Sequence, residues 1–244
     1  MTKQLLKQTI ESKAFKEDCP DIRFEGNQLV GTLKIQAEDR VELLDTMFPG
    51  KRVRRSHTDG QPTIIRFATH IFEREIYPYQ DKVLATYKVN DLGYQFGYDY
   101  IEAGIKPIKF KHEQINTVLT IEENNKTVAF YDITLSLSKS KGEVMLNLNL
   151  NQIYVMPQYR GSTYWMDLTV AAHSFASLVL YHVAKELPQP YYFDVCVSSD
   201  FYSKSDERIA NAIVSEIRVM FSLLPSLSIN RPAFIGEVVA DMGY

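Results

Sequence analysis

The segment EVMLNLNLNQIYV, residues 143–155, alternates between apolar and polar side chains in the manner of a half-buried β-strand. Valine or leucine occupies the even positions up to Leu150, and asparagine occupies the odd positions from 147 to 151. After Asn151 the alternation changes phase, because Ile153 and Val155 place apolar side chains at odd positions. Since side chains alternate strictly along a strand, this change predicts an inserted residue, a β-bulge, near residues 151–153. The other interpretation is that the strand ends at Asn151 and that a loop follows.

Two further strand-like segments precede this one. Residues 117–122 and 127–138 are rich in Val, Ile, Leu, Thr and Tyr, and Glu123-Asn-Asn-Lys126 between them is typical of a hairpin turn. A second turn at residues 139–142 leads into the segment that begins at Glu143. The pattern predicts a three-stranded antiparallel meander.

Downstream of the meander the pattern changes to a helix over residues 163–187, a strand over 191–197, a helix over 205–224 and a strand over 232–240. A meander followed by β-α-β-α-β predicts an α/β protein, that is, an α+β mixed sheet with helices on its faces. Upstream, the sequence predicts a helix in the first dozen residues, strands at 28–37, 63–68 and 82–89, and a helix at 37–48.

The residues around the phase change read Ile153-Tyr-Val-Met-Pro-Gln-Tyr-Arg-Gly161. This segment resembles the signature of the GNAT acyltransferase superfamily, in which a bulged strand ends in Val-x-Pro-x-Tyr-Arg-Gly and turns into a helix. The resemblance implies a GNAT-like, acyl-CoA-binding core over residues 111–244. Residues 1–110 are then an N-terminal extension that completes or covers the sheet.

The resemblance also implies how acetyl-CoA, or another acyl-CoA, binds as a co-substrate. The main chain around Tyr154 and Val155 pairs with the acyl carbonyl and the pantetheine arm. The loop formed by Arg160, Gly161, Ser162 and Thr163, together with the helix that follows, holds the pyrophosphate. A helix N-terminus favours an anion, and Arg160 adds a full positive charge, so this assignment is physically reasonable.

The loop departs from the family pattern, which usually reads Arg-x-x-Gly-x-Gly or Ala. Here it reads Arg160-Gly-Ser-Thr-Tyr-Trp165. The Thr163 hydroxyl can cap the helix or contact a phosphate. Trp165 stands where the family has almost no side chain, and it shares a helical face with Leu168 and Ala172. We therefore expect the indole ring to turn into the core.

Acyl transfer to an amine needs a neutral nitrogen, a stabilised carbonyl oxygen and a proton for the departing thiolate. Some members of the family place a carboxylate base about level with Asn147. Because an amide cannot act as a base, the asparagines at 147, 149 and 151 are expected either to orient a polar substrate or to line a solvated face. Asp132, Glu143 and Asp194 are the candidate carboxylates, with surface or paired acids as the alternative. Tyr202 is the candidate for protonating the thiolate.

The composition and charge of the chain limit which partners, metals and locations are expected. The chain carries 27 Lys and Arg against 30 Asp and Glu, a net charge of −3, so nucleic acid is not an expected partner. The basic run at residues 51–55 is interpreted as a solvated loop, with contact to coenzyme phosphates, an acidic substrate or nucleic acid as the alternatives. Cys19 and Cys196 fit a reducing compartment, and the five histidines show no metal-ligand spacing, so no metal is expected. No stretch is long and apolar enough to cross a bilayer, and no signal-peptide pattern is present, so a cytoplasmic location is expected.

The resemblance at residues 153–161 implies an acyltransferase that moves an acetyl or other acyl group from acyl-CoA to an amine of a small molecule or protein. The expected mechanism is direct attack in a ternary complex. The alternative is a non-catalytic GNAT-like binding or scaffold protein that has lost CoA binding through the changes at Thr163 and Trp165. Homodimer formation stays open.

Overall fold

The computed structural model describes residues 5–26, 28–48, 60–68, 113–140, 143–186, 192–200, 204–227 and 234–243. The first part contains α1 (Leu5–Glu11), α2 (Lys13–Asp18), β1 (Arg23–Glu25), β2 (Gln28–Ile35), α3 (Ala37–Met47) and β3 (Thr63–Ala68). The second part contains β4 (Glu113–Glu123), β5 (Lys126–Ser140), β6 (Glu143–Val155), the short 3-10 helix η4 (Pro157–Tyr159), α7 (Tyr164–Glu186), β7 (Tyr192–Asp200), α8 (Lys204–Leu227) and β8 (Phe234–Gly243).

The strands form one mixed sheet in chain order, from β1 at one edge to β8 at the other. Neighbouring strands from β1 to β6 are antiparallel, whereas β6 pairs with β7 and β7 with β8 in parallel. This confirms the α/β class and the meander of β4, β5 and β6. The first hairpin turns through Asn124 and Asn125, whose φ angles of 52° and 61° lie in the left-handed region that asparagine tolerates.

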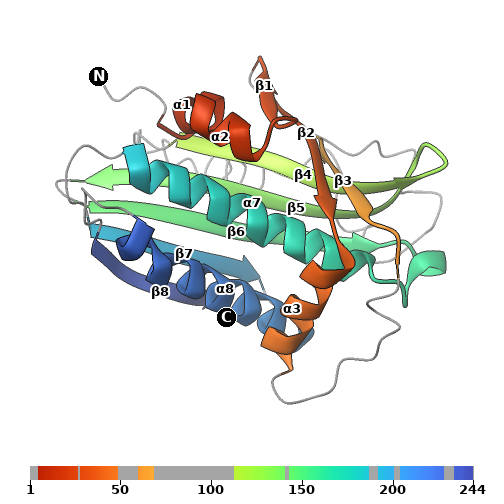
Figure 1. Ribbon diagram of the computed structural model, residues 1–244. Helices are drawn as coiled ribbons and strands as arrows, with labels where there is room; N and C mark the ends of the chain where they lie inside the picture. Colours follow the sequence, from red (N-terminus) through yellow and green to blue (C-terminus); the bar gives the residue numbers. More distant parts are fainter. Residues whose placement is uncertain are drawn as a thin grey trace, which may run out of the picture.

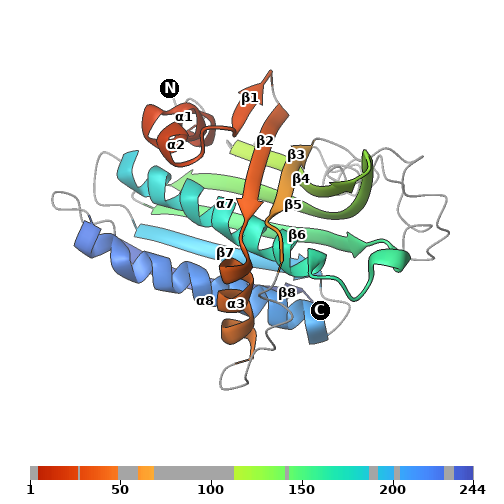
Figure 2. The ribbon, with the colours of Figure 1, turned by 45° about the vertical axis from the view of Figure 1, so that its right-hand side comes forward.

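The described helices all pack on one face of the sheet (Figures 1 and 2). The reason lies in the connections: α7 links β6 to β7 and α8 links β7 to β8, and both steps move along the sheet in the same direction. Because such crossovers are right-handed, both helices reach the same face. The opposite face of the sheet is covered by none of the described helices.

The main core lies between this sheet and its helices. Buried residues of α7 face buried residues of β4, β5 and β6, and α1 and α2 extend the same core toward β2. Trp165 packs against this core, which confirms the inward orientation expected for its ring. The helical face that carries this contact comprises Leu168, Ala172, Phe175, Val179 and Val183.

Some sequence predictions fall outside the described residues. They are the strand at 82–89, the basic run at 51–55 and the domain boundary between residues 110 and 111, so that boundary stays a prediction. Within the described residues, β2 and β3 belong to the same sheet as β4. The three-residue strand β1 was not predicted, because it is too short to show an alternation.

Gly31 of β2 is expected to tolerate no side chain. Its φ is +140°, and a Cβ atom built there would lie 2.3 Å from the Asp21 carbonyl oxygen. Gly31→Ala should therefore lower the free energy of unfolding by at least ~2 kcal/mol, measured by urea denaturation. Gly26 has a φ of +65° and nothing within 4 Å of such a Cβ, so Gly26→Ala should cost only ~1 kcal/mol. Equal losses at the two positions would contradict the close approach at Gly31.

Candidate functional site

β6 contains the β-bulge that its change of phase predicted. Asp132 of β5 lies opposite Gln152, and the next residue, Ile133, lies opposite Leu150. Asn151 is thus the extra residue of β6. The bulge keeps the polar and apolar faces of the sheet continuous, because Asn149 before it and Tyr154 after it lie on the same face.

The parallel pairing of β6 with β7 ends just before the bulge. It runs from Glu143 opposite Tyr192 to Asn149 opposite Ser198, whereas β6 continues to Val155. At the last pair, the Ser198 hydroxyl donates a hydrogen bond to Oδ1 of Asn149. Among the described residues, the two strands separate beyond this pair, and the asparagine–serine contact marks the point of separation.

A row of polar side chains crosses the helix-free face of the sheet at this level. Asn151 Nδ2 donates to the Thr134 hydroxyl at 3.0 Å, and that hydroxyl donates to Oδ1 of Asn116 at 3.2 Å. Asn151 and Asn149 are therefore fixed by neighbours. Asn147 is half-buried, and among the described residues its side chain makes no hydrogen bond.

Asp132 lies beside this row and is the most unusual polar group of the face. It is 1% exposed, and within the described part of the chain its Oδ2 atom has no hydrogen-bond partner. Burial raises the pKa of Asp132 to about 6, and a hydrogen bond from Asn151 opposes this rise in part. A carboxylate with such a pKa is ionised at neutral pH and can accept a proton from a reacting group.

An aromatic cluster adjoins Asp132 on the same face. Phe130, two residues before Asp132 on β5, is buried against Tyr154, with 5.6 Å between the ring centroids, and Val118 and Met156 complete the cluster. These apolar neighbours explain why the carboxylate is poorly solvated. Of the other candidate carboxylates, Glu143 begins β6 and Asp194 lies opposite Met145, so both are near the end of β6 away from the bulge.

The loop after β6 brings three predicted site residues together. Nε of Arg160 donates to the Val155 carbonyl at 3.2 Å, and the Arg160 guanidinium carbon lies 5.7 Å from the centroid of the Tyr154 ring. Tyr154 is buried, Val155 is half-buried and Arg160 is exposed. The positive charge of Arg160 is therefore held at the end of β6 while it still faces solvent.

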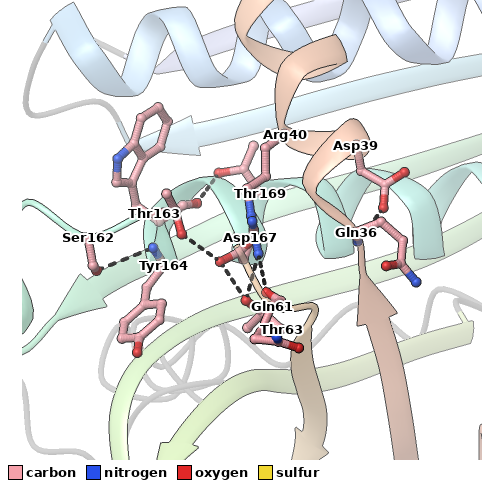
Figure 3. Close-up of polar contacts among 11 residues, drawn as sticks. Gln36, Asp39, Arg40, Gln61, Thr63, Ser162, Thr163, Tyr164, Asp167 and Thr169 are labelled. Carbon is pink, nitrogen blue, oxygen red and sulfur yellow. Dashed lines mark hydrogen bonds and ion pairs between the residues drawn. The ribbon is translucent and has the colours of Figure 1, made fainter. Parts of the chain in front are cut away.

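Gly161, Ser162 and Thr163 connect this loop to α7. Gly161 has a φ of +94° and open space where a Cβ would stand, and Ser162 Oγ accepts a hydrogen bond from the Tyr164 N–H at 3.4 Å (Figure 3). The Thr163 carbonyl accepts the first helical bonds, from the N–H groups of Met166 and Asp167. Its hydroxyl donates to Oδ2 of Asp167 at 3.2 Å, so the described contact of Thr163 is with the helix itself.

A buried ion pair anchors the first turn of α7 to the N-terminal part of the chain (Figure 3). Arg40 of α3 is 3% exposed and its Nε lies 2.5 Å from Oδ1 of Asp167, which is fully buried. The Thr63 hydroxyl accepts from Arg40 at 2.9 Å and donates to Oδ2 of Asp167 at 3.0 Å, and Arg40 also donates to the Gln61 carbonyl. Sequence reasoning missed this network. Its signal was present, since Asp167 is the only Asp, Glu, Lys or Arg between Arg160 and Lys185.

Tyr202, the predicted proton donor, lies outside the described residues, so its role stays a prediction. Three further observations concern the described residues. A groove of about 680 Å³ lies between α3 and α8, where Glu38, Glu42, Asp45 and Glu216 make its lining acidic, and it shares no residue with the predicted site. No described group of three or more His, Cys, Asp or Glu side chains could hold a metal ion. No helix in the described ranges is long and apolar enough to cross a membrane.

The thiol of Cys19 is a poor nucleophile. Burial, with the charges of Asp18 and Asp21, raises its pKa to about 11. The thiolate, which is the reactive form, is therefore scarce at neutral pH.

No protein-family model matches the chain, and no curated protein matches it. The functional assignment thus depends on the geometry at the end of β6.

Proposed function

We propose that the protein is a GNAT-like acyltransferase that moves an acetyl or other acyl group from acyl-CoA to an amine. The observation that carries this proposal is the combination, on one strand, of the bulge at Asn151, the end of the β7 pairing at Asn149, and the Arg160 loop that leads into α7. The order of a meander followed by two parallel β-α-β steps supports the same assignment.

In this proposal the chain contributes two binding functions and two proton transfers. The main chain near Tyr154 and Val155 holds the acyl carbonyl and pantetheine arm, and Arg160 with the N-terminus of α7 holds the pyrophosphate. Asp132 takes a proton from the amine as its nitrogen bonds to the carbonyl carbon and the carbon–sulfur bond breaks. Tyr202 remains the candidate that gives a proton to the leaving thiolate.

The alternative, a binding or scaffold protein without CoA, is favoured by one observation. The Thr163 hydroxyl donates its hydrogen bond to Asp167. Asp167 is a buried acidic residue in the first turn of α7, the helix whose N-terminus would face the pyrophosphate. A carboxylate at that position adds a negative charge, which the Arg40 guanidinium neutralises. Coenzyme binding separates the two functions directly.

Calorimetric titration with acetyl-CoA is expected to give a micromolar Kd, and Arg160→Ala should weaken it about 10- to 100-fold, because one charge-assisted contact to phosphate is lost. Arg23→Ala is the matched control, since Arg23 is an exposed arginine on β1, paired with Glu25. It should leave the Kd unchanged. Absence of heat at millimolar acetyl-CoA would exclude the proposed function and favour the scaffold.

A further inference from the structure

We propose that Asn151, the extra residue of the β-bulge, is a positioning residue of the acyl transfer. Its side-chain amide, held by Thr134, donates a hydrogen bond to Asp132 and leaves Oδ2 of that carboxylate as the atom that takes the proton of the amine. This inference rests on the proposed function and adds to it the residue that orients the base.

The bulge decides where the Asn151 amide lies. Without the extra residue, Asn151 would stand directly opposite Asp132. The bulge puts Gln152 in that place, so Asn151 lies between two levels of the sheet. Asp132 and Thr134 are two residues apart on β5, which is about 7 Å along the strand. An amide between their levels is therefore within reach of both side chains.

Hydrogen bonds on β4 and β5 fix which end of the amide faces Asp132. Asn151 Nδ2 donates to the Thr134 hydroxyl at 3.0 Å. That hydroxyl has a single proton, which it donates to Oδ1 of Asn116 at 3.2 Å, so it acts toward Asn151 as an acceptor. The Gln114 side chain also donates to Oδ1 of Asn116, at 2.7 Å, which keeps that atom an acceptor. The Nδ2 end of Asn151 is thus turned toward β5, and Asp132 accepts a hydrogen bond from the same side chain.

Asn151 supplies the contact that favours the ionised form of Asp132. Burial raises the pKa of Asp132 to about 6, and the hydrogen bond from Asn151 acts in the opposite direction. The titratable side chains that adjoining elements place on this face near its level are Arg66, Glu122, Tyr154 and Arg160. Arg66 and Glu122 pair with each other at 3.5 Å, and Arg160 donates to a main-chain carbonyl of β6. Within the described ranges, Oδ2 of Asp132 has no partner, so the amide holds the carboxylate without blocking this atom.

The first measurement is an NMR titration of the Asp132 carboxyl carbon, assigned by its loss in Asp132→Asn. It needs neither coenzyme nor turnover. The wild type should titrate with a midpoint at about pH 6. Asn151→Leu should raise the midpoint by about one pH unit, because a hydrogen bond to the charged form is lost. Thr134→Val should also raise it, since the amide is no longer held, whereas Thr134→Ser keeps the hydroxyl and should leave it unchanged.

The second measurement is the pH profile of thiol release from saturating acetyl-CoA, with 2-aminoethanol as the probe amine and rates referred to its free base. Because kcat/KM follows the ionised fraction of the base in the free enzyme, its rise with pH should move upward by the same amount as the NMR midpoint. Asn151→Leu should thus be about fivefold slower than the wild type at pH 6, and this difference should largely disappear by pH 8.

Thr120→Val is the matched control for Thr134→Val. Thr120 is also a buried threonine of this face, and its hydroxyl donates to the Arg66 carbonyl at 3.4 Å rather than to a group that contacts Asp132. Its replacement should move neither the NMR midpoint nor the rate profile.

Two results would overturn the inference. One is an NMR midpoint that stays at its wild-type value in Asn151→Leu, or that is equal in Thr134→Val and Thr134→Ser. The other is a raised NMR midpoint with an unmoved rate profile, because Asn151 would then act on a carboxylate that takes no part in the reaction. The proposed function fails on a different result, the absence of acetyl-CoA binding, on which the NMR titration does not depend.

Discussion

Replacing Asp132 with asparagine is expected to stabilise the protein at pH 7.5 by up to about 3 kcal/mol and to slow the proposed acyl transfer about 10²- to 10⁴-fold. The two effects share one cause. The carboxylate is buried beside an aromatic cluster, its Oδ2 atom has no partner within the described residues, and its pKa is raised from 3.8 to about 6. A neutral amide of the same shape avoids the cost of the buried charge but cannot accept the proton of the amine.

The direction of the pH effect follows from the raised pKa. Between pH 4 and 6 the folded protein holds a proton on Asp132 that the unfolded chain has lost, so the contribution of this group to stability falls as pH rises. It is fully present below pH 4, is lost as pH rises through about 6, and stays constant above about 7. The difference in unfolding free energy between Asp132→Asn and the wild type should therefore be small at pH 4 and largest at pH 7.5.

Urea denaturation at the two pH values measures this difference, and kcat with acetyl-CoA measures the catalytic effect. In the wild type, kcat/KM should also rise with pH through about 6 as the base ionises. Asp45→Asn, at an exposed carboxylate of α3, is the control and should alter neither stability nor rate by more than a small amount. A stabilised variant that keeps full activity would remove Asp132 from the mechanism while leaving its buried charge established.

The phase change in residues 143–155 predicted the bulge because the information is local. Alternation along one strand is visible in its own sequence, and an extra residue must reverse it. The meander and the β-α-β-α-β order after it were predicted for the same reason, since turn residues and helical periodicity are read within short windows. Asp132 was predicted only as one of three carboxylates. Asp132 differs from the other two carboxylates because it is buried and lies on β5 beside the bulge of β6. Both properties depend on packing between strands.

Contacts between distant segments were the part that the sequence did not reveal. The pairing of Asn149 with Ser198 depends on where the parallel register of β6 and β7 ends. Arg40 and Asp167 are 127 residues apart, and α3 alone does not indicate which of its charged residues is buried. The isolated position of Asp167 in an apolar helix predicts a buried partner but cannot identify it.

Breaking the buried Arg40–Asp167 pair is expected to cost more stability than breaking any exposed ion pair of the described residues. Arg40→Met leaves the fully buried Asp167 carboxylate without its cation, which should cost about 3–5 kcal/mol of unfolding free energy. Asp167→Leu leaves the Arg40 guanidinium buried and should cost a similar amount. The double variant removes both charges, so its loss should be smaller than the sum of the single losses by about 3 kcal/mol or more.

This double-mutant cycle of Arg40 and Asp167 is informative because the chain also contains an exposed ion pair for comparison. Lys13 and Glu17 of α2 are 3.7 Å apart with side chains 93% and 66% exposed, and their coupling should stay below about 0.5 kcal/mol. Similar coupling in the two cycles, measured by urea denaturation, would contradict the burial of the Arg40–Asp167 pair. A large coupling has a consequence for the site as well. Asp167 also accepts a hydrogen bond from the Thr163 hydroxyl, so the single variants should loosen Thr163, which immediately precedes α7, and weaken acetyl-CoA binding. The Lys13 and Glu17 variants should not.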